Sequence, residues 1–199
     1  MPLLEWASAA FTKPGHSDSG DLYLVKTLPQ GLLAAVIDGI GHGSEAASVA
    51  NLARDVVDSY ADECVVSLIH RCHRRLYGTR GVVMSLASID AQANQMSWVG
   101  VGNVQCVVLA RRPGGTAVEN SLLLRAGVVG VRLPSMKAEV QSISRGDTIV
   151  FATDGVKLGF DRGLASTLPP QSAADQILAE YGDASDDALV LVGRYLGET

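Results

Sequence analysis

The order in which strand-like and helical patterns follow one another constrains the fold of this chain more than any other feature. Two helical stretches stand together between Ser44 and Gly78, and a third covers residues 171–181. Strand-like segments lie before, between and after them, at residues 4–11, 22–28, 32–37, 82–90, 95–101, 104–111, 138–143, 148–152 and 188–195. A parallel sheet would place a helix between successive strands. The segregated helices therefore predict an α+β fold, with two antiparallel β-sheets packed face to face as a sandwich and flanked by α-helices.

Short turns between neighbouring segments predict antiparallel hairpins. The turn Pro29–Gly31 would place Asp21, at the start of one strand, beside Asp38, at the end of its partner. The dipeptide Gly102–Asn103 is of the kind that favours a tight hairpin, and Arg112–Gly115 is expected to form a loop. Because no linker or internal repeat divides the sequence, we expect a single domain that spans residues 1–199.

Composition and charge argue against several classes of function. The net charge is -5 and the only concentrated basic run is Arg71–Arg75, so we expect no nucleic-acid partner. No apolar run is long enough to span a membrane, and the N-terminus lacks the basic region of a signal peptide. Three widely spaced cysteines do not form a disulfide framework and predict a cytoplasmic protein. Cys72 points away from the helix face that His70 and His73 share, so no zinc site is expected.

Four acidic stretches stand beside turn residues, each where a strand begins or ends. They are Ser17–Asp21, Asp38-Gly39, Thr153–Gly155 and Ser185–Asp187. Taken singly, each is explained by the preference of Asp for turns. If the four converge in space, their carboxylates would raise one another's pKa values unless a cation lies among them. A set of oxygen donors without thiolates selects Mg²⁺ or Mn²⁺ over zinc.

An ordered set of motifs carries a resemblance to a known family. The motifs are SDSGD at 17–21, VIDGIGHG at 36–43, GVGN at 100–103, FATDG at 151–155 and DDALVLV at 186–192. In this order and at this spacing the chain resembles the PPM class of metal-dependent serine/threonine protein phosphatases, and within it the bacterial SpoIIE-type branch. The resemblance implies a sandwich of two antiparallel sheets flanked by helix pairs, and a hydrolase that acts on phosphoserine and phosphothreonine in proteins.

The resemblance also implies a site for two divalent cations, Mn²⁺ or Mg²⁺. Asp38 would bridge the two ions, and the Gly39 carbonyl would contact one of them. Asp21 would bind the same ion as Gly39, directly or through water, whereas Asp154 and Asp186 would hold the other. A water activated by the two ions would hydrolyse the phosphate without a covalent intermediate. Asp38 and Asp21 are therefore the implied catalytic residues.

Five further residues near these motifs are candidates for supporting roles. Some relatives hold the phosphate with an arginine shortly before the first acidic motif, whereas this chain offers Lys13 and His16. His42 is a further candidate for a phosphate contact, and either histidine is a candidate general acid. Asp18 and Asp187 are candidates for supporting the metal ligands from outside the immediate coordination sphere.

Free-standing members of the SpoIIE-type branch are similar to this chain in length. That resemblance implies phosphorylated STAS-domain proteins of the stressosome as substrates and partners. The protein would then reset the general stress response.

Two other functions remain open on the sequence. DGIGHG is similar to the DxGxG box of GHKL-type nucleotide-binding kinases, but that fold places a helix well before the box and leaves Asp154 and Asp186 without a role. The second alternative is a PPM-fold binding protein that has lost catalysis, although all four ligand carboxylates are present.

Overall fold

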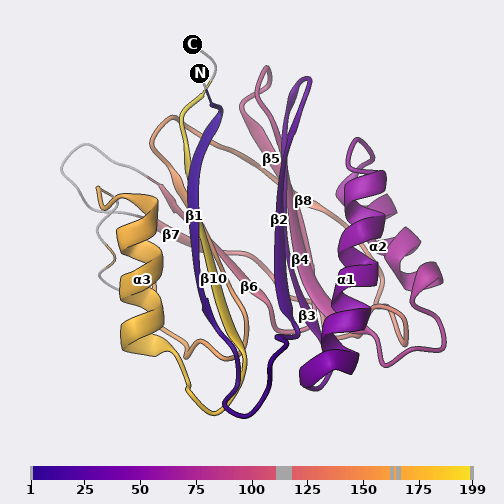
Figure 1. Ribbon diagram of the computed structural model, residues 1–199. Coiled ribbons are helices and arrows are strands. Elements are labelled where there is room, and N and C mark those ends of the chain that lie inside the picture. Colours follow the sequence, from indigo (N-terminus) through magenta and orange to yellow (C-terminus); the bar gives the residue numbers. More distant parts are fainter. Residues whose placement is uncertain (1, 111–117, 162–163, 165–166, 198–199) are drawn as a thin grey trace.

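The computed structural model describes residues 2–110, 118–161, 164 and 167–197. Two five-stranded sheets pack face to face, with helices on both outer sides (Figure 1). The strands are β1 (Leu4–Phe11), β2 (Asp21–Leu28), β3 (Gly31–Gly39), β4 (Val82–Asp90), β5 (Gln95–Val101), β6 (Gln105–Ala110), β7 (Val118–Ser121), β8 (Glu139–Ser142), β9 (Thr148–Ala152) and β10 (Ala188–Tyr195). The helices are α1 (Gly43–Ser59), α2 (Val65–Arg75) and α3 (Pro170–Tyr181).

All strand pairs within the two sheets are antiparallel. Sheet A has the order β1-β10-β9-β6-β7, and sheet B has the order β2-β3-β4-β5-β8. Helix α3 covers the outer face of sheet A, whereas α1 and α2 cover the outer face of sheet B (Figure 1). The predicted α+β sandwich is confirmed, because each sheet needs apolar cover on both faces and the helices supply the outer layers.

Strand β3 lies at the centre of this packing because it is buried on both faces. Its side chains alternate between the layer shared by the two sheets and the layer under α1 and α2; they are Leu32, Ala34 and Val36 on one face and Leu33, Ala35 and Ile37 on the other. Burial on both faces explains why this segment is a continuous apolar run rather than an alternating one. The strand therefore holds its C-terminal residues, Asp38 and Gly39, in a fixed place.

The helices bury small and apolar side chains spaced by three or four residues. In α1 these include Ala46, Ala50, Ala53 and Val57, which lie against sheet B. The small side chains let the helix approach the sheet closely. No helix in the described part of the chain is both long and apolar enough to cross a membrane.

The tight hairpin expected at Gly102–Asn103 is wrong. Strand β5 pairs within sheet B and β6 pairs within sheet A, so these two residues carry the chain from one sheet to the other. Gly102 has a φ of +94°, in the left-handed region, and its N–H donates to the Arg125 carbonyl. A left-handed φ is the conformation that favours glycine. A Gly-Asn dipeptide, which is typical of tight hairpins, here connects two strands that belong to different sheets.

One strand escaped the sequence-based prediction. β7 pairs with β6 at the edge of sheet A, but its sequence, VENS, contains a single apolar residue and gives no alternating pattern. The loop expected at Arg112–Gly115, and the expected end of the preceding strand at Arg111, lie outside the described residues.

Candidate metal centre

The candidate site is built on the hairpin of β2 and β3 at one end of the sandwich. Asp21 and Asp38 are directly opposite each other in the antiparallel register, as the turn Pro29–Gly31 predicts. Beyond this pair, the Gly39 N–H donates to the Gly20 carbonyl at 3.0 Å. Two carboxylates are thereby fixed side by side where the chain leaves the sheet.

A pocket of about 490 Å³ opens over this end of the hairpin. Seven of the residues predicted for the site line it: Lys13, Asp21, Asp38, His42, Asp154, Asp186 and Asp187. They come from segments that are far apart in the sequence, and the loops that follow β3 and β9 and precede β10 bring them together. The remaining walls are formed by Ile40, Gly41, Val83, Gly102, Asn103 and Ala126.

Asp21 is one of the two most buried carboxylates of the pocket, with 6% of its surface exposed. Burial raises its pKa to about 7, and the charge of Asp187 adds to the rise. The Thr153 hydroxyl donates to Asp21 Oδ2 at 2.7 Å and opposes this rise in pKa. Thr153 is itself held in place, because the Leu189 N–H donates to its Oγ1 at 2.9 Å. Strands β9 and β10 thus orient a side chain that belongs to β2.

Asp38 is half-buried, and its carboxylate accepts no hydrogen bond from any described residue. Burial raises its pKa to about 8, with Asp21 the largest of the neighbouring charges that add to the rise. A cation would stabilise the charged form of this carboxylate more than water does, because the cation offsets both the cost of desolvation and the repulsion between the carboxylates.

The donor set fits hard divalent cations such as Mg²⁺ or Mn²⁺. All the charged groups that face the pocket as donors are carboxylates, the ligands that these ions prefer. Within the described residues, no three His, Cys, Asp or Glu side chains are already gathered as ligands of one ion. Carboxylates that are spread around the pocket in this way are compatible with Mg²⁺, because that ion usually keeps several waters and binds only one or two carboxylates.

Asp154 is oriented by a residue from the crossing between the sheets. The Asn103 amide donates from Nδ2 to Asp154 Oδ2 at 2.7 Å. Asp154 is exposed at the mouth of the pocket, so without this contact its side chain would be free to rotate away. The crossing of the chain at Gly102–Asn103 therefore has a direct consequence for the site.

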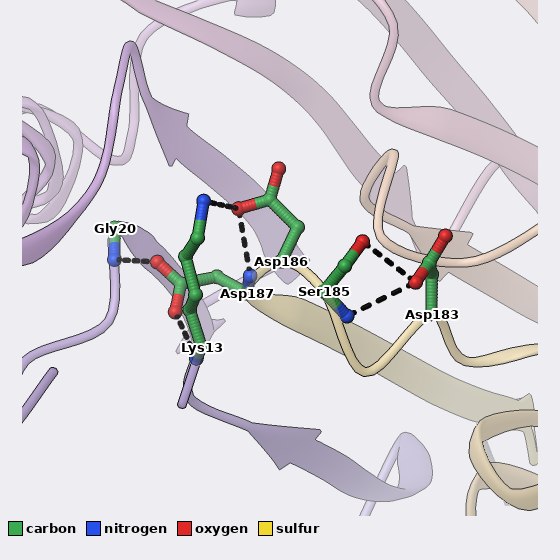
Figure 2. Close-up of polar contacts among 6 residues, drawn as sticks. All are labelled: Lys13, Gly20, Asp183, Ser185, Asp186 and Asp187. Carbon is green, nitrogen blue, oxygen red and sulfur yellow. Dashed lines mark hydrogen bonds and ion pairs between the residues drawn. The ribbon is translucent and has the colours of Figure 1, made fainter. Parts of the chain in front are cut away.

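Asp187 ties the first loop of the chain to the start of β10. Its two carboxylate oxygens accept from the backbone N–H groups of Lys13 and Gly20, each at 2.8 Å (Figure 2). Although it lines the pocket, Asp187 has both oxygens engaged and 6% of its surface exposed, so it holds the loop in place. The loop that it anchors leads directly into Asp21.

Asp186 differs from its neighbour in what it offers to the pocket. One of its oxygens accepts from the Asp187 N–H at 3.0 Å and lies 3.7 Å from Lys13 Nζ, whereas the other accepts no hydrogen bond from a described residue (Figure 2). The preceding turn is closed by Asp183, which accepts from the N–H and the hydroxyl of Ser185. Asp186 is thus presented to the pocket on a braced turn.

We expect Asp187→Asn to lower the free energy of unfolding by roughly 2 kcal/mol, because an amide NH₂ would face one of the two backbone donors and leave it unsatisfied. Urea denaturation measures the change. Asp18→Asn is the matched control. Asp18 is exposed, and among the described residues its carboxylate accepts a hydrogen bond only from Ser17. This substitution should change the free energy of unfolding by less than about 0.5 kcal/mol. Equal stability of the two variants would contradict the anchoring role.

Two glycines of the Asp-Gly pairs are required by close packing. A Cβ on Gly39 would lie 2.3 Å from the Ala46 carbonyl oxygen, and a Cβ on Gly155 would lie 2.0 Å from the Asp187 carbonyl oxygen. Both neighbours are backbone atoms that cannot move aside cheaply. These glycines let α1 and the start of β10 approach the two carboxylate-bearing strand ends.

Three predicted residues lie outside the pocket wall. Gly39 is buried beside it, so the role of its carbonyl as a ligand stays a prediction. His16 stacks on His42, with ring centroids 4.6 Å apart, and reaches the rim only through that contact. Asp18 is exposed and bonds to Ser17. Of the two histidines, only His42 lines the pocket.

The sequence reasoning missed three residues that shape the site. Asn103 and Thr153 stand within the motifs GVGN and FATDG, so a polar residue in a conspicuous motif was the available signal. Arg80 stands in no motif. Its Nη1 donates to the Ile40 carbonyl at 3.1 Å, and its Nη2 pairs with Glu45 at the start of α1. Arg80 thereby braces the loop that follows Asp38.

Comparison with known proteins finds relatives in sequence and in fold. The chain is 30% identical over 146 residues to the phosphoserine phosphatase RsbX of Bacillus subtilis (strain 168), which covers 73% of this chain and 71% of RsbX. A crystal structure of RsbX in complex with magnesium has a TM-score of 0.85 and 24% identity, and the match covers 96% of this chain and 95% of RsbX.

A second solved structure comes from a study of the bacterial stressosome as a modular system adapted to control secondary messenger signalling. It has a TM-score of 0.85 and 29% identity, and the match covers 96% of this chain and 99% of that one. Residues 29–196 match the family model described as stage II sporulation protein E, SpoIIE.

The two-sheet sandwich with its cluster of carboxylates at one end defines a phosphatase of the PPM class, and the expected fold and enzyme class are confirmed. Within that class, the chain belongs to the SpoIIE family. The expected resemblance to a PPM-class phosphatase of the SpoIIE-type branch is confirmed by the family match and by RsbX. The GHKL alternative loses its support, since no helix precedes β3 in the described residues and the Asp-Gly turn follows a β-hairpin.

Proposed function

We propose that this protein is a metal-dependent phosphatase of phosphoserine and phosphothreonine in proteins. The observation that carries the proposal is Asp38, a half-buried carboxylate with a pKa near 8, no hydrogen-bond donor among the described residues, and Asp21 opposite it. A divalent cation in the pocket would compensate both charges. The relative RsbX, which is named a phosphoserine phosphatase and was crystallised with magnesium, supports the same reading.

The ligands proposed for two divalent cations are those that the family motifs imply. Asp38 would contact both ions, Asp21 and the Gly39 carbonyl would belong to one, and Asp154 and Asp186 to the other. Bound there, such ions supply Lewis-acid polarisation of the phosphate and a water of lowered pKa. No nucleophilic side chain is needed.

The protein's own residues would orient this chemistry. Thr153 and Asn103 hold the carboxylates of Asp21 and Asp154 by hydrogen bonds at 2.7 Å. The Lys13 ammonium lies over the pocket, 3.7 Å from Asp186 Oδ1, where it would attract a phosphate dianion. His42, which lines the pocket, would donate a proton to the leaving serine oxygen. A site assembled in advance loses little entropy when the substrate binds.

The proposed substrates are phosphorylated STAS-domain proteins of the stressosome. Two similarities support this assignment: RsbX at 30% identity, and the stressosome-related structure at 29% identity over nearly the whole of both chains. The protein would then act as a cytoplasmic single-domain phosphatase that resets the general stress response.

The test is release of phosphate from an aryl phosphate and from a phosphoserine peptide, with Mn²⁺ or Mg²⁺ and with EDTA. We expect turnover that requires the metal and stops when EDTA is added. Calorimetry on the same samples measures metal binding directly. Binding of metal without turnover of the aryl phosphate, the peptide or a phosphorylated STAS-domain protein would favour the catalytically silent binding protein instead.

A further inference from the structure

Two depressions lie along α1 beyond the metal pocket, and we call the face of α1 that joins them the groove. Ile40 and Gly41 line the pocket, and the Arg80 guanidinium donates to the Ile40 carbonyl, so Arg80 forms part of the rim. On its other side Arg80 lines a second depression, of about 360 Å³, together with Ser44, Glu45, Ser48, Val49 and Thr79. Arg80 therefore stands between the pocket and this depression.

A third depression lies further along α1, between α1 and α2. That depression is lined by Val56, Tyr60, Arg71, Arg74 and Arg75. Glu45, Val49, Val56 and Tyr60 are separated by four, seven and four residues, which places them on one face of the helix. From Glu45 to Tyr60 the helix rises by about 22 Å, a length that roughly seven residues of extended peptide would span.

The far end of the groove is positively charged, although the whole chain carries a net charge of -5. Arg71 lies over the Tyr60 ring at 3.9 Å and pairs with Glu63. Arg74 and Arg75 are exposed and form no ion pair within the described part of the chain. Two unpaired guanidinium groups beside an aromatic ring favour a partner that brings carboxylates.

We propose that this groove binds an acidic segment of the phosphoprotein substrate while the phosphorylated residue occupies the metal pocket. The inference rests on the proposed phosphatase function. It assigns the basic run Arg71–Arg75 a role in choosing the substrate: acidic residues about six positions from the phosphorylated serine would reach Arg74 and Arg75. Arg80, which forms an ion pair with Glu45, would lie between the metal pocket and the Arg74–Arg75 end of the groove.

The experiment compares Arg74→Gln/Arg75→Gln with the wild type on three substrates. They are an aryl phosphate, a phosphoserine peptide with an acidic cluster six residues from the phosphoserine, and the same peptide with Gln in place of each acidic residue. We expect KM for the acidic peptide to rise roughly three- to tenfold in the variant, as for loss of two exposed charge pairs. The other two substrates should keep their KM, and kcat should not change.

Arg145→Glu is the matched control, because it changes the net charge by the same two units. Arg145 lies in the turn between β8 and β9, beside the residue whose N–H donates to the Tyr195 carbonyl where β10 ends. Helix α1 begins at the opposite end of the sandwich (Figure 1). This variant should keep the KM of the wild type for all three substrates. An equal rise in KM would mean that overall charge, not the groove, governs the preference, and would overturn the proposal.

Direct binding separates this inference from the phosphatase proposal. Fluorescence anisotropy of the labelled, unphosphorylated acidic peptide in EDTA requires neither metal nor turnover, and should show binding that weakens in Arg74→Gln/Arg75→Gln and at high salt. Absence of turnover with this binding intact would reject the phosphatase function alone. No binding by the wild type, or binding of a labelled oligonucleotide in its place, would reject the acidic-peptide groove.

Discussion

We expect Asp38→Asn to reduce metal-dependent phosphate release by at least roughly a hundredfold while the protein stays folded. Loss of a residue that merely supports a metal ligand typically costs 10- to 100-fold, and Asp38 is proposed to contact both cations. Asparagine has nearly the same shape but removes the charge. Phosphate release from an aryl phosphate at saturating Mn²⁺ measures the change, and thermal unfolding verifies the fold.

Asp90→Asn is the matched control for this prediction. Asp90 lies at the far end of β4 from the pocket, where its carboxylate closes a turn by accepting from the Ala93 N–H. Its removal should leave turnover within about twofold of the wild type, the scatter expected of a surface substitution. Full activity in Asp38→Asn would exclude Asp38 from the chemistry and with it the proposed pair of cations.

The melting temperature of the EDTA-treated protein should fall by roughly 15 °C or more as the pH rises from about 5 to about 8. Both Asp21 and Asp38 have a raised pKa in the folded protein, about 7 and about 8, against an ordinary value of 3.8. The folded state therefore keeps protons that the unfolded chain has already lost, and stability declines as pH rises through the folded pKa values. One pKa unit corresponds to about 1.4 kcal/mol, and 1 kcal/mol to roughly 2–4 °C at this chain length.

Two further samples check the cause of this fall. Saturating Mg²⁺ should remove most of it, because cation binding favours the charged carboxylates that high pH produces. Asp38→Asn in EDTA should show a smaller fall than the wild type, since one of the two raised groups is gone. A melting temperature that is level from pH 5 to pH 8 in EDTA would show that neither carboxylate carries a burial cost.

Much of the architecture follows from local patterns. Segregated helices and turn-linked strands predict the sandwich, and the turn at Pro29–Gly31 predicts the pairing of Asp21 with Asp38, which the register confirms. Such features depend on hydrophobic period and turn chemistry within a few residues of one another. The short strand Val118–Ser121 was missed because its polar sequence has no period to recognise.

The working details of the site depend on contacts between residues that are far apart in the chain. Gly102–Asn103 has the composition of a hairpin turn, yet β5 and β6 join different sheets, and this crossing brings Asn103 to Asp154. Asp186 and Asp187 are adjacent carboxylates in sequence. They differ because the first loop docks its backbone N–H groups on Asp187 and leaves Asp186 facing the pocket.

Local sequence thus indicates which segments form strands and helices, and it marks the acidic turns as candidates for the site. Long-range packing then assigns each residue its task, because burial, hydrogen-bond partners and neighbouring charges arise only when distant segments meet. Arg80 illustrates the difference: nothing beside it in the sequence distinguishes it, but the folded chain sets its guanidinium on the Ile40 carbonyl at the rim of the pocket.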